Sequence, residues 1–144
     1  MTVTGIVLLV LAVVVAVGFG LYRRRIDGRF ATAAAAAPTT WTAVAGAVPD
    51  VALGERATLV QFSSAFCAPC RTTRVVLADV AGRVDGVAHV EIDAEQHLEL
   101  VRALDVRRTP TTLVLDGAGH EITRAAGAPR REQVLAALPT LQES

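Results

Sequence analysis

Two cysteines, Cys67 and Cys70, have the residue type and spacing for chemistry, and they are the only cysteines among the 144 residues. They are spaced C-x-x-C and follow a short apolar run at residues 59–62, which predicts a buried strand. Pro69 suits the first turn of a helix. Cys67 would then lie at a helix N-terminus, where unpaired N–H groups and the helix dipole favour a thiolate. We predict Cys67 as a nucleophile and Cys70 as the resolving thiol.

Three other interpretations of the cysteine pair remain open at this point. A zinc site needs three or four protein ligands, and His89, His97 and His120 are scattered without ligand spacing. A structural disulfide would close so short a loop that it contributes only about 2 kcal/mol. An inert pair of core cysteines is common in general, but a proline between them at a strand-to-helix turn is not typical of it.

The cysteine turn, with a second motif further along the chain, resembles the thioredoxin family. That family's active-site turn commonly reads Trp-Cys-Gly-Pro-Cys, and residues 66–70 here read Phe-Cys-Ala-Pro-Cys. Thr109-Pro110-Thr111 stands where the family places a cis-proline against the dithiol. The match continues at Asp116-Gly117 and Gly127, and it covers about Leu53 to Leu138.

The resemblance implies a fold, a chemistry and a set of partners. The fold is α/β, with a central mixed sheet and helices on both faces. The expected activity is thiol–disulfide exchange on protein disulfides, with a thiol electron donor or acceptor. The redox-active disulfide Cys67–Cys70 is the only cofactor expected, with no metal. Substrate contacts are expected at Phe66, Ala68, Pro69, Thr109 and Pro110, with the Thr109 backbone free to pair with an extended substrate.

The hydrophobic pattern after Cys70 predicts the alternating elements of such a fold. Val76, Leu77, Val80 and Val84 form the buried face of a helix that ends at Gly82 or Gly86. The pattern further predicts a strand at Ala88–Ile92, followed by a helix that Asp93 caps and that buries Leu98, Val101 and Leu104. Two strands, Thr111–Leu115 and His120–Ala125, are expected around a hairpin turn. Pro129 then opens a last helix that buries Val134, Leu135 and Leu138.

Two residues depart from the family pattern. Gln61 stands where the family often buries an aspartate that handles the proton of the resolving thiol, so that proton must leave through water or another group. Phe66 replaces the usual tryptophan and keeps the apolar lip without the indole N–H. His89 is a candidate substitute for proton handling, although a solvated or core histidine is the commoner fate. Arg107 and Arg108 could favour the Cys67 thiolate.

The N-terminal segment predicts a membrane helix. No charge occurs from Val3 to Leu21, and nineteen residues at helical rise cover about 29 Å. Tyr22 suits the membrane interface, and four arginines follow at positions 23–25 and 29. By the positive-inside rule, the catalytic domain would face the cytoplasm. A cleaved secretory signal is the alternative, but it normally carries its positive charge before the apolar run.

These features divide the chain into a transmembrane helix at 1–22, a basic flank and Ala/Thr/Pro-rich tether at 23–49, and a thioredoxin-like domain at 50–144. Trp41 is predicted to be a packing residue or an interface anchor.

The formal net charge is zero, and no basic stripe occurs, which argues against nucleic-acid binding. The leading function is a membrane-tethered, cytoplasmic protein-disulfide reductase. The alternatives are an extracytoplasmic thiol oxidant or maturation factor for cytochromes or secreted proteins, and a non-catalytic binding module with the thioredoxin fold.

Overall fold

The computed structural model describes residues 3–27 and 38–140. The chain falls into two units, Met1–Ala36 and Ala37–Ser144, and each is described by itself. Predictions that concern residues 28–37, including Arg29 and the first part of the Ala/Thr/Pro-rich tether, lie outside the described residues.

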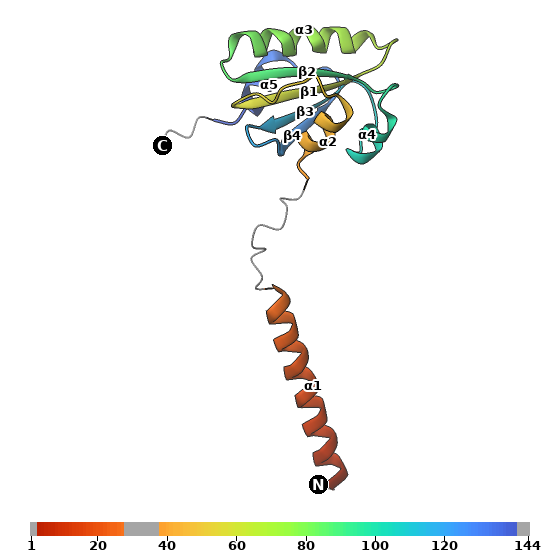
Figure 1. Ribbon diagram of the computed structural model, residues 1–144, viewed down its shortest axis with the longest axis vertical. Helices are drawn as coiled ribbons and strands as arrows, with labels where there is room; N and C mark the ends of the chain where they lie inside the picture. The colour runs from red at the N-terminus through yellow and green to blue at the C-terminus, as the bar shows by residue number, and fades with distance from the viewer. Residues whose placement is uncertain (1–2, 28–37, 141–144) are drawn as a thin grey trace. The chain divides into compact units, whose positions relative to one another are not determined.

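The second unit is organised around a four-stranded sheet in the order β2-β1-β3-β4 (Figure 1). The strands are β1 (Ala57–Ser63), β2 (Val87–Asp93), β3 (Thr111–Asp116) and β4 (Glu121–Ala126). β1 pairs with β2 in parallel and with β3 antiparallel, and β3 pairs with β4 antiparallel. The sheet is therefore mixed, as predicted. Every residue of β1 is buried, because this strand lies inside the sheet and is covered on both faces.

Alternate residues of β1 point to two separate apolar clusters, one on each face of the sheet. On one face Leu59 packs with residues of α3 (Ala68–Arg83) and α5 (Arg131–Ala137). On the other face Val60 and Phe62 pack with residues of α2 (Thr40–Ala47) and α4 (Leu98–Ala103). Helices therefore cover both faces, as predicted. Cys67 follows the end of β1, at the edge of the sheet between the two apolar clusters.

Helix α2 corrects the predicted boundary between tether and domain. It lies inside the segment 23–49 that was assigned to the tether, and its Val44 is fully buried in the core. Trp41 is partly buried against the same cluster, and its backbone N–H donates to the carbonyl of Gly119 at 3.0 Å. Trp41 is thus a packing residue. The folded unit begins before residue 50 because an alanine-rich helix can bury one face without a strong hydrophobic period in its sequence.

Asp93 does not cap a helix as predicted. It is the last residue of β2, and its carboxylate accepts hydrogen bonds from the Glu95 N–H at 2.8 Å and the Gln96 side chain at 3.1 Å. α4 begins four residues later than this cap would allow, after His97. Its buried residue is Leu100, whereas Leu98 is 53% exposed. Val101 and Leu104 pack against the core as predicted, so the sequence period placed the buried face correctly except at Leu98.

Smaller differences occur at the other predicted ends. Gly82 lies inside α3, and the chain turns at Gly86, where φ is 75°. β4 begins at Glu121 rather than His120, after a turn in which the Asp116 carboxylate accepts from the His120 N–H at 2.9 Å. In the last helix Val134 and Leu138 are buried, as predicted, but Leu135 is 40% exposed.

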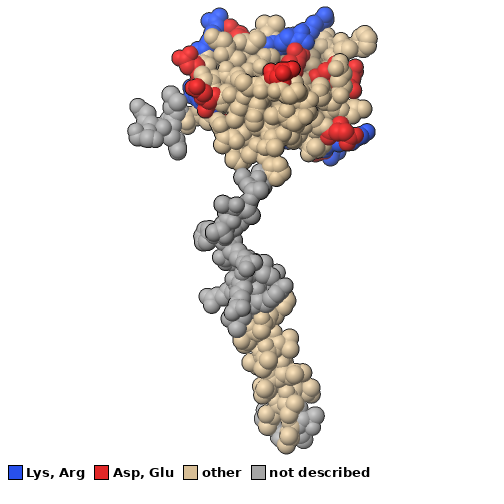
Figure 2. Space-filling model, viewed as in Figure 1, with Lys and Arg blue, Asp and Glu red and all other residues tan. Residues whose placement is uncertain are grey.

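In the first unit, α1 spans Val3–Asp27, so the helix continues past residue 22. The side chains described along it are exposed, and Figure 2 shows no charged group among them. Within the two described ranges, the structure contains no helix long and apolar enough to cross a membrane. The transmembrane helix predicted at Val3 to Leu21 is therefore not supported.

Candidate active site

Cys67 and Cys70 are joined by a disulfide at the start of α3, with their Cα atoms 5.2 Å apart. Cys67 is the N-cap residue, and its sulfur accepts a hydrogen bond from the Cys70 N–H at 3.2 Å. Pro69 occupies the first turn, as predicted, and its carbonyl accepts from the Thr73 hydroxyl at 3.0 Å. An N-cap sulfur that already accepts a hydrogen bond from a backbone N–H is well placed to be stabilised as a thiolate once the disulfide is reduced.

The two sulfur-bearing residues differ in exposure. Cys70 is 1% exposed, while Cys67 is half-buried and its neighbour Phe66 is fully exposed, at 100%. Ala68 and Pro69 are also exposed. A partner disulfide can therefore approach Cys67 more readily than Cys70, and the roles of nucleophile and resolving thiol stay predictions.

The Thr109-Pro110 peptide bond is cis, and it lies beside the cysteine turn. The Thr109 hydroxyl and the Ser64 hydroxyl are 3.0 Å apart, and the Ser64 carbonyl accepts from the Cys67 N–H at 3.4 Å. Ser64 thus connects two motifs that are more than forty residues apart in sequence. In the described part of the chain, the Thr109 N–H and C=O have no backbone partner, so both are available to an extended substrate strand.

Gln61 lies directly behind Cys70 and is fully buried. Its amide nitrogen donates to the Cys70 carbonyl at 2.8 Å and to the Ser63 hydroxyl at 3.0 Å. Its amide oxygen is 3.2 Å from His89 Nε2 and accepts a hydrogen bond from that nitrogen. Gln61 therefore satisfies its own buried polar atoms while it links the cysteine helix to β2.

A charged pair continues this network. Glu91 accepts from the Ser63 hydroxyl at 2.7 Å and from Arg74 Nε and Nη2 at 2.6 and 2.7 Å. The hydrogen bond from Arg74 is the main cause that lowers the pKa of Glu91 below its ordinary value. Burial lowers the pKa of His89, so the ring of His89 is held in its neutral form near pH 7.

A cavity of about 470 Å³ opens beside the disulfide, and Cys67, Cys70, Arg74 and Glu91 are among the residues that line it. Its position gives solvent a path to the resolving cysteine. Water in this cavity, next to the Glu91 carboxylate, offers a route for the proton of Cys70 that does not require a titratable group at position 61.

Comparisons with known proteins now bear on this arrangement. The thioredoxin family model matches residues 47–140, which is more than half of the chain. The chain belongs to the thioredoxin family. Thioredoxin H2-1 of Oryza sativa subsp. japonica is 34% identical over 74 residues, which cover 51% of this chain and 53% of that protein. The chain thus spans about half the length of the curated relatives it matches.

Solved structures show the same fold. A mutant thioredoxin from Halobacterium salinarum NRC-1 matches with a TM-score of 0.54 and 21% identity, over 58% of this chain and 73% of the other. The thioredoxin of Fasciola hepatica matches with a TM-score of 0.51 and 24% identity, over 58% and 78% of the two chains. The thioredoxin-like α/β fold is therefore established by both the family model and these structures.

Within the thioredoxin fold, the structure separates the candidate residues. It brings Phe66, Cys67, Cys70, Thr109 and Pro110 to one end of the sheet, as the motifs predicted. Two further predicted contributors do not join this group. Arg107 pairs with Asp105 at 3.0 Å, and Arg108 lines a different hollow with Arg107 and Arg124. The expectation that the two arginines act on the Cys67 thiolate is thus not supported.

Sequence reasoning did not identify Ser63, Ser64, Arg74 and Glu91 as parts of the site. Ser63 shares a strand face with Gln61, and Glu91 shares one with His89, because side chains alternate along a strand. That alternation was the available signal for Ser63 and Glu91. No signal in the sequence indicates that Arg74 reaches β2 or that Ser64 meets Thr109.

Proposed function

We propose that this chain is a thiol–disulfide oxidoreductase that reduces protein disulfides through Cys67 and Cys70. The observation that carries the proposal is the position of the cysteine pair, at the start of α3 beside the cis Thr109-Pro110 bond. Cys67 is the more exposed of the two cysteines, and the backbone N–H and C=O of Thr109 have no backbone partner in the described residues. The C-x-x-C pair in a thioredoxin-family chain supports the same activity.

The reaction begins when a thiol donor reduces the Cys67–Cys70 disulfide with two electrons and two protons. The Cys67 thiolate then attacks one sulfur of a substrate disulfide, which forms a mixed disulfide and releases the first substrate thiolate. Cys70 loses its proton and attacks the sulfur of Cys67. The second substrate thiolate leaves, and the Cys67–Cys70 disulfide is restored.

The test is reduction of a generic protein disulfide by the full chain, with dithiothreitol as the electron source. Cys67→Ser should lose activity completely. Cys70→Ser should lose turnover but accumulate mixed disulfides through Cys67, visible by mass spectrometry. The two variants are matched controls for each other, because each removes one sulfur atom. Full activity in Cys67→Ser would refute the proposed nucleophile, and an inactive wild-type chain with two titratable thiols would favour a binding module.

We also propose that the uncharged segment at residues 3–21 attaches the domain to a membrane, with the domain on the cytoplasmic side. The support is the row of exposed apolar side chains on α1 together with the arginines that follow in the sequence. On the cytoplasmic side the dithiol would meet a reducing thiol pool and act as an electron donor.

A further inference from the structure

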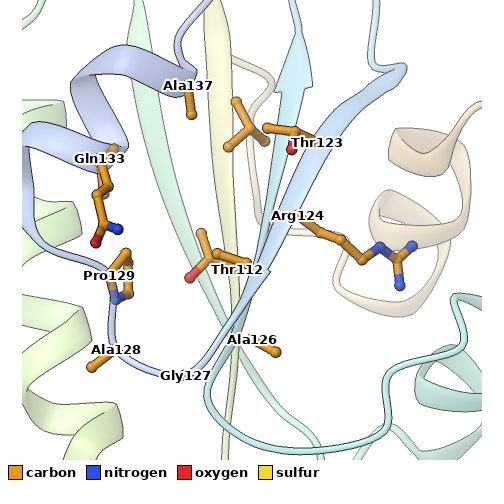
Figure 3. Close-up of a pocket in the computed structure, with 12 residues that line it drawn as sticks. Thr112, Thr123, Arg124, Ala126, Gly127, Ala128, Pro129, Gln133 and Ala137 are labelled. Atoms are coloured by element: carbon orange, nitrogen blue, oxygen red, sulfur yellow. The ribbon is translucent and has the colours of Figure 1, made fainter.

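A second cavity lies away from the disulfide, between the β3–β4 hairpin and α5, and has a volume of about 250 Å³ (Figure 3). Val114 and Val134 line its inner part, and Gly127, Pro129 and Ala137 form the loop and helix walls. The walls are made mostly of small apolar residues. Because small side chains leave the space between sheet and helix unfilled, the cavity arises from the sequence of this chain.

Thr112 lines this cavity and carries a buried hydroxyl that is unsatisfied. The residue is 2% exposed, and its Oγ1 is the one buried side-chain nitrogen or oxygen in the described ranges that has no hydrogen-bond partner. Its cross-strand neighbour Gln61 is already engaged with Cys70, Ser63 and His89 and does not satisfy it. Buried hydroxyls rarely stay unpaired in native proteins, so this hydroxyl points to a missing partner.

The polar groups around the cavity are neutral. Arg124 is the only charged lining residue among those described, and its guanidinium is bound to the Glu121 carboxylate and the Leu104 carbonyl. Figure 3 shows Arg124 pointing away from Gln133, which stands across the space from Thr112. The Gln133 amide oxygen accepts from the Arg130 N–H at 2.9 Å, which leaves its NH₂ group as a free donor. A charged ligand would therefore find no counterion here.

The volume indicates the size of ligand that fits, although the pocket is open to solvent along the exposed residues of β4. An apolar protein cavity of about 150 Å³ is large enough to bind benzene, so about 250 Å³ accommodates one six-membered ring with a substituent. We propose that this cavity binds a small, uncharged, monocyclic molecule that carries one hydroxyl group, of the phenol class. The ring would pack against Val114 and Val134, and its hydroxyl would hydrogen-bond to Thr112. This site is separate from the redox function proposed above.

Phenol and benzene are suitable probes, because they differ by the one hydroxyl that the proposal requires. Each is titrated into the oxidised, ¹⁵N-labelled full chain. Both should shift the amide signals of Gly127 and Ala137, and phenol should bind about threefold to tenfold more tightly, the effect of one neutral hydrogen bond. The Gly127 amide is a sensitive reporter, because it donates to the Pro110 carbonyl at 2.8 Å and lines the cavity.

Two threonine variants isolate the hydroxyl that is recognised. Thr112→Val should reduce phenol binding to the level of benzene and leave benzene binding unchanged. Thr123→Val is the matched control, because Thr123 also lines the cavity but is exposed on β4, and it should keep the preference for phenol. Equal loss in both variants, or no loss in Thr112→Val, would overturn the proposed contact.

Ala137→Leu tests the cavity itself by filling it, and circular dichroism checks that the variant folds. This variant should bind neither probe. If it binds both as tightly as the wild type, or if neither probe shifts any amide of the wild type, the proposed site does not exist. These results do not depend on disulfide reduction, since the oxidised protein is used throughout.

Discussion

At the scale of single residues, Gln61 has the position of a proton-handling group without the ability to titrate. Its amide nitrogen holds the Cys70 carbonyl at 2.8 Å, and its oxygen accepts from His89. Its role in this structure is thus to position the start of α3 and to bridge α3 to β2. Because Gln61 cannot titrate, we expect the proton of Cys70 to leave through the cavity beside the disulfide, which both Cys70 and Glu91 line.

Gln61→Asp should restore a titratable group behind Cys70. We expect faster release of the mixed disulfide near neutral pH, with little change in the first attack by Cys67. The free energy of unfolding should fall by about 1–3 kcal/mol, because a buried carboxylate replaces an amide donor that faces a carbonyl oxygen. Stopped-flow kinetics and denaturant unfolding measure the two effects.

Gln61→Asn is the matched control for this experiment, because it has the same shape as the aspartate variant without its charge. It should lose stability but show no faster release. If the two variants release the mixed disulfide at equal rates, the carboxylate has no role in resolving it.

Glu91 should make stability depend on acid pH. Its folded-state pKa is lowered, chiefly by the hydrogen bond from Arg74, so its contribution is present above the ordinary pKa of a glutamate and is lost as pH falls through the lower folded value. His89, whose pKa burial lowers, acts in the same direction: its contribution declines as pH falls below about 6.5.

Glu91→Gln should flatten the acid side of the curve of unfolding free energy against pH. The glutamine keeps an acceptor for Arg74 but does not titrate, so the decline below about pH 4.5 should be shallower than in the wild type. The effect should be modest, because the Arg74 partner is half exposed. Glu55→Gln, at an exposed position, should leave the wild-type slope intact. A Glu91→Gln curve that is parallel to the wild type throughout would contradict this account.

At the scale of elements, α2 is the part of the fold that the sequence pattern did not reveal. It covers the face of the sheet opposite α3, and in Figure 1 it lies near α4 against the strands. Val44 is its fully buried side chain, and the Thr39 hydroxyl caps the helix by accepting from the Thr42 N–H at 3.2 Å. The helix belongs to the domain because Val44 joins the same cluster as Val60.

Val44→Ala should lower the free energy of unfolding by about 2 kcal/mol, from lost burial of two methyl groups and the small cavity they leave. Gly46→Ala is the matched control on the same helix, since nothing lies within 4 Å of the added carbon. That change should raise stability by up to about 1 kcal/mol, because alanine favours helix more than glycine does. If Val44→Ala had no measurable effect in denaturant unfolding, α2 would not be part of the cooperative domain.

At the scale of the whole molecule, two units with different surfaces share one chain. The described side chains of α1 are uncharged, whereas the domain carries mixed acidic and arginine groups around an uncharged centre on the face shown in Figure 2. The first surface suits an apolar environment, and the second suits water. This difference in surface is what the proposed attachment of residues 3–21 to a membrane rests on.

The predicted topology can be tested by fusing alkaline phosphatase and a fluorescent protein separately after Ser144. We expect an inactive phosphatase and a bright fluorescent fusion, because arginines next to a membrane segment favour the cytoplasmic face by about 1 kcal/mol each. Replacement of Arg23, Arg24 and Arg25 by glutamine should weaken this bias. The opposite pattern would place the domain outside and favour an oxidant, while a product without the first ~35 residues in the extracellular fraction would identify a signal peptide.

The sequence by itself determined the strand–turn–helix around Cys67 and Cys70, the β3–β4 hairpin and the order of strands and helices along the chain. These depend on local signals, namely apolar period, proline in the first turn and the turn residues at Asp116-Gly117. Only the tertiary structure decided that Ser64 meets Thr109, that Gln61 holds the Cys70 carbonyl, that α2 joins the core and that Thr112 faces a cavity. Each of these depends on which side chains lie opposite one another across the folded sheet, and residues far apart in sequence carry no local signal of that pairing.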